Sequence, residues 1–166
     1  EILNERGYAT LRIDMSGVGR STGEFSNQTI DSHVEDLVLF TQYVKEHISE
    51  DIIFVGHDIG GLIGILANEI SSVEGIITFS TSFNFDYYDF KGKNIDNFEH
   101  PELFKINVND NTTIVRKDYM GIIDENFIHE ILDNSKTPLI SVFFEEDDQV
   151  SYEKSMEILK STHSNI

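Results

Sequence analysis

The sequence predicts an α/β domain whose strands form a mostly parallel sheet flanked by helices. Residues 51–56, 74–80 and 138–144 are short apolar segments without polar alternation, as expected of strands whose two faces are covered. Residues 60–70 are apolar on nearly every side, which predicts a buried helix. Residues 34–48 keep the spacing of an amphipathic helix. Strands and helices therefore alternate along the chain, as in βαβ units.

The segment before the amphipathic helix predicts one more strand and a loop. Tyr8–Asp14 is short and largely apolar, which indicates a buried strand. Met15–Gln28 is rich in Gly, Ser, Thr and Asn, which is typical of a loop. Ser32 is followed three residues later by Glu35, the pattern of a capping box. We therefore expect the helix to begin near Ser32.

The pattern changes in the second half of the chain. Residues 81–137 are polar, aromatic and rich in Asn and Asp, which predicts an insertion, or lid, over the sheet edge. Within it, 112–119 fits a strand or hairpin and 124–133 a short helix. The last predicted strand is followed by an acidic turn and a helix at 151–162. We expect one domain over residues 1–166, incomplete at both ends, with exposed strand edges and poor stability alone.

Composition and charge exclude several classes of partner and site. The net charge of −18 disfavours nucleic acid as a partner. No apolar run approaches the ~20 residues of a membrane span. The chain has no cysteine, which excludes disulfides, zinc–thiolate sites and a cysteine nucleophile. We expect a small-molecule substrate, no cofactor, no metal and a cytoplasmic location. The sequence does not predict an oligomeric state.

The segment from Gly56 to Gly61 carries the strongest chemical pattern. A predicted strand passes directly into a predicted helix, with glycines on both sides of Asp58. This is the spacing of a nucleophile elbow, where a strained turn lifts the central side chain to the carboxyl edge of the sheet. Glycine two positions before and after would let strand and helix approach closely. The simpler alternative is a strand–helix joint in which Asp58 only caps the helix.

Three motifs in this order resemble the α/β-hydrolase superfamily, over nearly the whole chain. They are Arg12-Ile13-Asp14-Met15-Ser16-Gly17-Val18-Gly19-Arg20-Ser21, Gly56-His57-Asp58-Ile59-Gly60-Gly61 and Phe143-Phe144-Glu145-Glu146-Asp147-Asp148-Gln149-Val150. The resemblance implies an α/β-hydrolase fold, with Asp58 at the nucleophile position and Asp147 as the acid of the triad. It also implies an oxyanion N–H from Ile59 and a histidine base beyond the chain end. The alternative for 145–148 is a solvated acidic turn.

The resemblance points to two chemistries. The scaffold, including residues 21–25, looks most like small serine esterases and serine-aminopeptidase-like hydrolases. Asp58 looks like the nucleophile of epoxide hydrolases and haloalkane dehalogenases, although those families often carry Trp where this chain has Ile59. We therefore expect a hydrolase acting on a small apolar substrate. The alternative is a serine-esterase-like scaffold with a substituted nucleophile, inactive or serving as a ligand- or protein-binding module.

Several other residues are candidates for binding or proton transfer. An aromatic cluster follows the third predicted strand and could form an apolar substrate wall or pin the insertion onto the sheet; it contains Phe83, Phe85, Tyr87, Tyr88 and Phe90. Tyr87, Tyr88 and Tyr119 are candidate proton donors. A dinucleotide loop at Gly17-x-Gly19 is disfavoured because Gly23 is one position late and no helix is predicted there.

Overall fold

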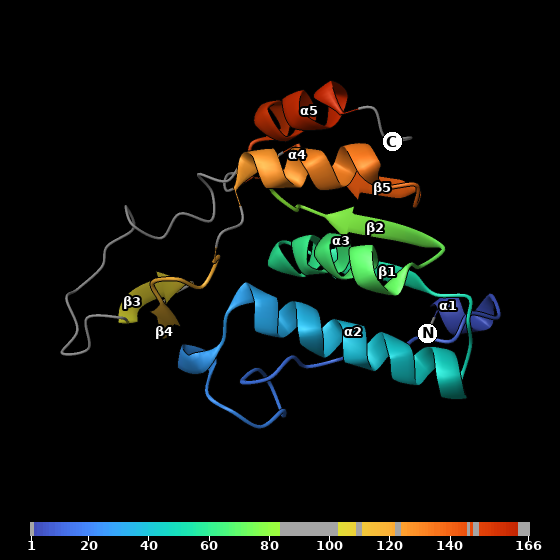
Figure 1. Ribbon diagram of the computed structural model, residues 1–166, viewed down its shortest axis with the longest axis horizontal. Coiled ribbons are helices and arrows are strands. Elements are labelled where there is room, and N and C mark those ends of the chain that lie inside the picture. The colour runs from blue at the N-terminus through green and yellow to red at the C-terminus, as the bar shows by residue number, and fades with distance from the viewer. Residues whose placement is uncertain are drawn as a thin grey trace.

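The computed structural model describes residues 2–83, 103–108, 111–121, 124–145, 147 and 150–162. Helices and strands alternate through the first half of the chain, as Figure 1 shows. The elements are α1 (Ile2–Glu5), the short 3-10 helix η1 (Phe25–Asn27), α2 (Ile30–His47), β1 (Ile53–His57), α3 (Ile59–Ser71), β2 (Gly75–Phe79), β3 (Leu103–Val108), β4 (Asn111–Arg116), α4 (Glu125–Asn134), β5 (Leu139–Val142) and α5 (Tyr152–Ser161).

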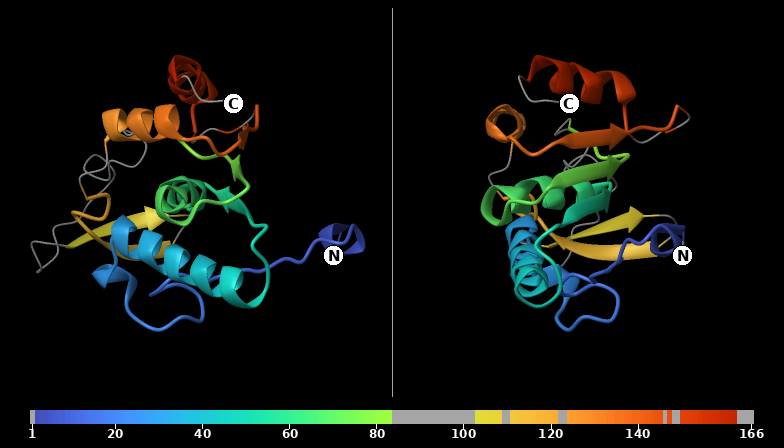
Figure 2. Two further views of the ribbon diagram at one scale, coloured as in Figure 1. Left: turned by 45° about the vertical axis from the view of Figure 1, so that its right-hand side comes forward. Right: turned by 90° about the vertical axis from the view of Figure 1, so that its right-hand side faces the viewer.

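The described central sheet is parallel, with the strand order β1-β2-β5. In the register, Phe54 of β1 lies opposite Ile76 of β2, and Ile77 lies opposite Ile140 of β5. Helix α3 packs against β1 and β2, and α2 packs against α3. Figure 2 shows α2, α3 and α4 on the same side of the sheet. This arrangement confirms the predicted α/β class and brings the carboxyl ends of the three strands to one edge.

The apolar sequence of α3 is explained by its central position. Every residue from Gly61 to Asn68 is buried, because the helix lies between the sheet and α2. Leu62, Ile65 and Ala67 are at most 2% exposed and belong to the main hydrophobic core. A helix that is apolar all round is stable only when neighbours cover it in this way.

Helix α2 begins two residues earlier than predicted. Thr29, in an extended conformation, accepts a hydrogen bond from the Ser32 backbone N–H at 3.3 Å. The Ser32 hydroxyl in turn accepts one from the Thr29 N–H at 3.0 Å. The capping box is therefore Thr29 with Ser32, and the prediction that used Ser32 and Glu35 is wrong. A serine at the third helical position took the role expected of a Glu or Gln.

The two faces of the sheet differ in exposure. Phe54 points into the core and is 9% exposed, whereas its neighbours Ile53 and Val55 are 53% and 61% exposed. On β5, Leu139 is buried and Ile140 is 59% exposed. The strands are thus apolar on both faces, but among the described elements the helices cover one of them. The prediction that both faces of the sheet are covered is therefore confirmed, among the described elements, only for the face on which α3 packs.

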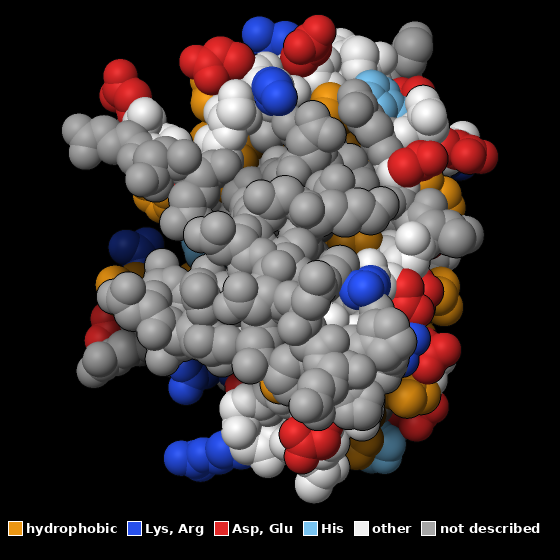
Figure 3. Space-filling model, turned by 90° about the vertical axis from the view of Figure 1, so that its left-hand side faces the viewer, with side chains coloured by type: hydrophobic (Ala, Val, Ile, Leu, Met, Phe, Trp, Pro, Cys, Tyr) orange, Lys and Arg blue, Asp and Glu red, His pale blue; other side chains and the backbone are white. Residues whose placement is uncertain are grey.

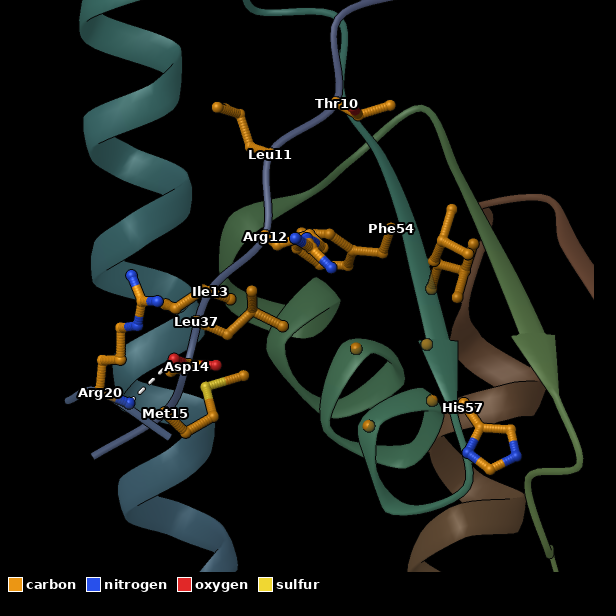
Figure 4. A pocket seen from close by; sticks show the side chains of 16 residues that line it. Thr10, Leu11, Arg12, Ile13, Asp14, Met15, Arg20, Leu37, Phe54 and His57 are labelled. Atoms are coloured by element: carbon orange, nitrogen blue, oxygen red, sulfur yellow. Dashed lines mark hydrogen bonds between the residues drawn. The ribbon is translucent and has the colours of Figure 1, made fainter. Parts of the chain in front are cut away.

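Tyr8–Asp14 does not form the predicted buried strand. The segment is irregular, and Tyr8 and Leu11 are 62% and 51% exposed. A strand requires a neighbour for its backbone hydrogen bonds, and none of the described strands pairs with this segment. A cavity of about 840 Å³ separates residues 10–15 from β1, and Figure 4 shows the two sides of it.

The described parts of the insertion include a hairpin and a helix. Strands β3 and β4 pair in antiparallel fashion from Leu103–Arg116 to Val108–Asn111. Most of 112–119 therefore forms one strand, which confirms the strand alternative for that segment. Helix α4 confirms the predicted short helix, capped by the Asp124 side chain.

Acidic side chains lie around the edge of the molecular face shown in Figure 3. Within the described residues, none of the helices combines the length and apolarity needed to cross a membrane.

Candidate active site

Asp58 occupies a strained position between β1 and α3. Its backbone angles are φ 51° and ψ −125°, in a region that residues with a side chain rarely adopt. Neighbouring groups hold it there. The Asp58 N–H donates to the Phe79 carbonyl at 2.9 Å, and its carbonyl accepts from the Thr81 hydroxyl at 2.9 Å. The turn therefore presents a strained residue held by two hydrogen bonds, and its role as a nucleophile elbow stays a prediction.

The glycines around Asp58 have unequal importance. A Cβ on Gly56 would lie 2.5 Å from backbone atoms of Gly60 and Gly61, and one on Gly61 would overlap the Thr81 hydroxyl. A Cβ on Gly60 would meet no atom within 4 Å. The expectation that glycine is needed two positions before Asp58 is thus confirmed, whereas the same expectation two positions after it is wrong. The second close approach involves Gly61 instead.

Asp58 is the N-cap residue of α3, but its side chain makes no capping hydrogen bond to the helix. This observation disfavours the alternative in which Asp58 serves only as a helix cap. The carboxylate still lies at a helix N-terminus, whose partial positive charge stabilises an anion. Ile59 is the first residue of α3, so its N–H belongs to the group that a helix cannot satisfy internally.

Asp147 lies after β5, at the same edge of the sheet as Asp58. Because β1, β2 and β5 are parallel, the segments that follow β1 and β5 emerge on one side. Asp147 is half-buried, its Oδ1 accepts the Val150 N–H at 3.0 Å, and its own N–H donates to the Phe144 carbonyl at 3.2 Å. These contacts fix the turn that carries the carboxylate. Glu145 is exposed, whereas Glu146 and Asp148 lie outside the described residues.

Three of the described histidines, His47, His57 and His129, do not lie in the turn that carries Asp147. The ring of His47 stacks on Tyr43, and His129 hydrogen-bonds to Ser161. His57 is exposed, and Figure 4 shows its ring beyond the end of β1. His100 and His163 lie outside the described residues. In the described part of the chain, no group of three or more His, Asp or Glu side chains could hold a metal ion.

A buried His–Tyr pair joins helix α2 to the turn after β4. The Tyr119 hydroxyl is 3.0 Å from His33 Nδ1, and His33 Nε2 is 3.2 Å from the Ser16 carbonyl oxygen. His33 and Tyr119 are 2% and 4% exposed, and both rings contact Phe25. Burial raises the pKa of Tyr119 to about 12, and the negative charge of Asp58 adds to the rise.

The structure describes one of the five residues of the predicted aromatic cluster, and Phe90 lies outside the described residues. Phe83 is 1% exposed and contacts Phe143 edge to face, with ring centroids 6.5 Å apart. This is the arrangement that the packing alternative predicts, and its role in substrate binding stays a prediction. Phe85, Tyr87 and Tyr88 lie outside the described residues.

The glycine-rich loop after Asp14 has a structural arrangement. The Asp14 carboxylate accepts the Arg20 N–H at 3.0 Å, and the Asp14 carbonyl accepts the Ser21 hydroxyl at 2.6 Å. Gly19 has φ 58°, and a Cβ there would overlap the Asp14 carboxylate. Since these contacts close the loop and no helix opens from it, the dinucleotide alternative is not supported.

Sequence reasoning missed two contributors to this site. Thr81, which holds the Asp58 carbonyl, belongs to a buried polar run, Ser80–Ser82, directly after β2. Its place at the carboxyl end of an apolar strand was a usable signal. The contact between His33 and Tyr119 joins residues 86 positions apart, and no local pattern indicates it.

Comparisons with known proteins agree with this geometry. Residues 1–103 match the family described as serine aminopeptidase, S33. No curated protein sequence matches the chain. A solved structure of Est1E from Butyrivibrio proteoclasticus with bound ferulic acid has a TM-score of 0.76 at 24% identity, covering 98% of this chain and 67% of that one. An esterase domain from Rhodothermus marinus has a TM-score of 0.61 at 12% identity, covering 84% and 56%.

The solved structures show the fold of the chain, whereas the family match shows its family. At such identities the two esterase structures show the fold, and the chain spans about two thirds or less of their length. The family match spans most of this sequence, including the elbow. The chain therefore belongs to the serine aminopeptidase S33 family and has the α/β-hydrolase fold.

Proposed function

We propose that this hydrolase uses Asp58 as a covalent nucleophile toward an electrophilic sp³ carbon, such as that of an epoxide or alkyl halide, in a small apolar substrate. The observation that carries the proposal is the position of a carboxylate, instead of a hydroxyl, on a strained elbow at the N-terminus of α3. A serine must lose a proton to a histidine before it attacks. Aspartate side chains are ordinarily ionised at neutral pH and need no such step.

The proposed reaction has two steps. With an epoxide, an Asp58 oxygen attacks a ring carbon and the carbon–oxygen bond breaks. The electron pair goes to the epoxide oxygen, which takes a proton from water, leaving a hydroxyalkyl ester on Asp58. Water then attacks the ester carbonyl, releasing a diol and restoring the carboxylate.

The other site residues support the second step in this proposal. Asp147 orients a histidine base, which is not assigned to a residue, and that histidine activates the water. The backbone N–H of Ile59 stabilises the oxyanion that forms on the Asp58 ester carbonyl. The second oxyanion donor is not assigned.

The proposal is tested by intact mass spectrometry after incubation with an epoxide, an alkyl halide and an aryl ester. In samples quenched with acid before the ester is hydrolysed, we expect a mass increase equal to the added alkyl group, located on Asp58 by peptide mapping. Asp58→Asn, which keeps the size of the side chain but removes the charge, should form no adduct. Folded wild-type protein that gains no mass with either alkylating reagent would refute the proposal.

A second candidate function is favoured by the esterase-like scaffold. The family match is described as a serine aminopeptidase, and one of the solved structures is described as an esterase domain. In this alternative Asp58 stands where an active serine was replaced, leaving a binding module. This alternative predicts no alkyl adduct on the wild-type chain. It also predicts that Asp58→Ser introduces acylation by an aryl ester, which the same mass measurement detects.

A further inference from the structure

The peptide group between Asp58 and Ile59 is held by hydrogen bonds to its carbonyl oxygen. The Asp58 carbonyl accepts the Thr81 hydroxyl at 2.9 Å and the Gly61 N–H at 3.0 Å. Gly61 belongs to α3 itself, whereas Thr81 follows β2 and is 1% exposed. A Cβ on Gly61 would overlap the Thr81 hydroxyl, so glycine at this position leaves the room that the hydroxyl needs. Thr81 therefore holds this peptide group from outside the helix.

The orientation of the Asp58 carbonyl also determines the direction of the Ile59 N–H. The two groups belong to one planar trans peptide, in which C=O and N–H point in opposite directions. The carbonyl points toward Thr81 and the first turn of α3. The Ile59 N–H therefore points away from them, out of the helix N-terminus. Among the described residues, none accepts a hydrogen bond from this N–H.

The backbone of Asp58 would relax if its carbonyl were released. Its ψ of −125° at φ 51° lies outside the left-handed region, where ψ is about +30° to +60°. Aspartate enters that region more readily than most residues with a side chain. A rotation of roughly 170° about ψ would reach it and would reverse the direction of the Ile59 N–H. The Thr81 contact opposes this rotation, because the buried hydroxyl would lose its acceptor.

We propose that Thr81 is a positioning residue for the oxyanion donor: its hydroxyl fixes ψ of Asp58 and so keeps the Ile59 N–H directed at the oxyanion of the Asp58 ester. The inference rests on the proposed function of Asp58 and adds a residue to its second step. The first step forms no oxyanion on Asp58, so its rate should depend little on Thr81. The second step forms a charged tetrahedral intermediate there, so its rate should depend on Thr81 strongly.

Hydroxylamine cleavage of alkylated protein isolates the second step. Protein alkylated on Asp58 with propylene oxide is freed of reagent and treated with hydroxylamine, whose nitrogen attacks the ester carbonyl. The resulting oxyanion collapses and the bond from the carbonyl carbon to the diol oxygen breaks. The diol leaves with a proton from the nitrogen, and a hydroxamate remains on Asp58. Intact mass follows this conversion, and the rate without hydroxylamine is subtracted.

The two steps should respond differently to Thr81. We expect Thr81→Val to slow hydroxylamine cleavage roughly ten- to hundredfold, at or below the range of about 10²–10³ for loss of a whole oxyanion donor, while alkylation stays close to the wild-type rate. Thr81→Ser keeps the hydroxyl and should restore cleavage. If Thr81→Val does not fold, Thr81→Cys, whose thiol is a weak donor, replaces it and should also slow cleavage alone.

Asn68→Ala is the matched control for lost stability. Asn68 holds the Val73 N–H at the other end of α3, so its loss destabilises the same helix without contact to Asp58. Both rates should stay near wild type in this variant. Equal slowing of both steps in Thr81→Val, or slowed cleavage in Asn68→Ala as well, would mean that Thr81 has a structural role only.

A second measurement needs no alkylation. Labelling the carbonyl carbon of aspartate and the nitrogen of isoleucine with NMR-active isotopes selects Asp–Ile peptide groups, of which the sequence has two, Asp51–Ile52 and Asp58–Ile59. The Asp58–Ile59 signal is the one missing from Asp58→Asn. We expect Thr81→Val to shift this signal and Thr81→Ser to leave it near its wild-type position. The Asp51–Ile52 signal is the internal control and should not move.

The outcomes separate the two proposals. An unshifted Asp58–Ile59 signal in Thr81→Val, or cleavage at the wild-type rate in that variant, would overturn the assignment of Thr81 alone. Absence of any adduct on wild-type Asp58, together with a shifted Asp58–Ile59 signal in Thr81→Val, would overturn the proposed function but not the orientation of the Ile59 N–H by Thr81.

Discussion

Replacing Gly56 with alanine should strongly destabilise the protein, because the strand and helix at the elbow are in backbone contact there. The new Cβ would lie 2.5 Å from the carbonyl carbon and oxygen of Gly60 and from the Gly61 Cα. Ordinary van der Waals contact begins at 3.4 Å. These are backbone atoms, so β1 and α3 must move apart by about 1 Å, and a cost of about 3 kcal/mol or more is expected for over-packing of this kind.

Gly60→Ala is the matched control. The site is two residues from Asp58, has no atom within 4 Å of the new Cβ and lies in the first turn of α3. The methyl group should fit without strain, and the higher helix propensity of alanine gives a change between zero and about 1 kcal/mol of stabilisation.

Urea unfolding followed by far-ultraviolet circular dichroism measures both changes. In thermal unfolding of a chain of this size, the same Gly56→Ala penalty would lower Tm by roughly 6–12 °C. The m-value should stay constant, since the unfolded surface is unchanged. A Gly56→Ala protein within about 0.5 kcal/mol of wild type, or a Gly60→Ala protein destabilised equally, would refute the reasoning, because that is the scatter of neutral substitutions.

Three further predictions concern buried polar groups. The pKa of Tyr119 rises on folding from 10.0 to about 12, so its contribution to stability is full below about pH 10 and is lost between about pH 10 and 12. This loss of folding free energy is at most about 2 to 3 kcal/mol. Alkaline unfolding of wild type and Tyr119→Phe measures the loss, and an equal loss in both proteins would contradict the prediction. Thr81→Val removes the hydroxyl bound to the Asp58 carbonyl and should cost about 1 kcal/mol, measured by urea unfolding; an unchanged midpoint would show that this bond is not needed. Asn68→Ala leaves the buried Val73 N–H without its acceptor and should cost about 1–3 kcal/mol, seen as faster hydrogen exchange at Val73.

The sequence alone was sufficient to predict those helices and strands whose local pattern agrees with their place in the fold. The strands β1, β2 and β5 and the helices around them were predictable because apolar runs and periods encode burial directly. Tyr8–Asp14 has the same kind of pattern, yet it is irregular in the structure. A strand pattern describes the side chains, whereas a strand also depends on a neighbour that supplies backbone partners.

The site was predictable to the extent that it depends on chain geometry. Asp58 could be placed at the elbow because glycine spacing is dictated by close backbone approach, whereas Asp147 was indicated by the resemblance and supported by the apolar strand before it. The pair His33–Tyr119 could not be predicted, since it depends on how the segment after β4 meets α2. Tyr119 was thus identified as a candidate donor without its buried hydrogen-bond partner, His33.

The elbow alone does not determine which reaction Asp58 performs. The strained backbone, the Thr81 contact and the closeness of Gly56 to Gly61 would position a serine as well as an aspartate. The chemical difference is what each can attack. A carboxylate attacking an ester carbonyl forms a reactive anhydride, whereas attack on an sp³ carbon forms an ester that the remaining site can hydrolyse. The choice between the two proposed functions therefore depends on the electrophile, which is why alkylation of wild-type Asp58, rather than a further comparison of folds, distinguishes them.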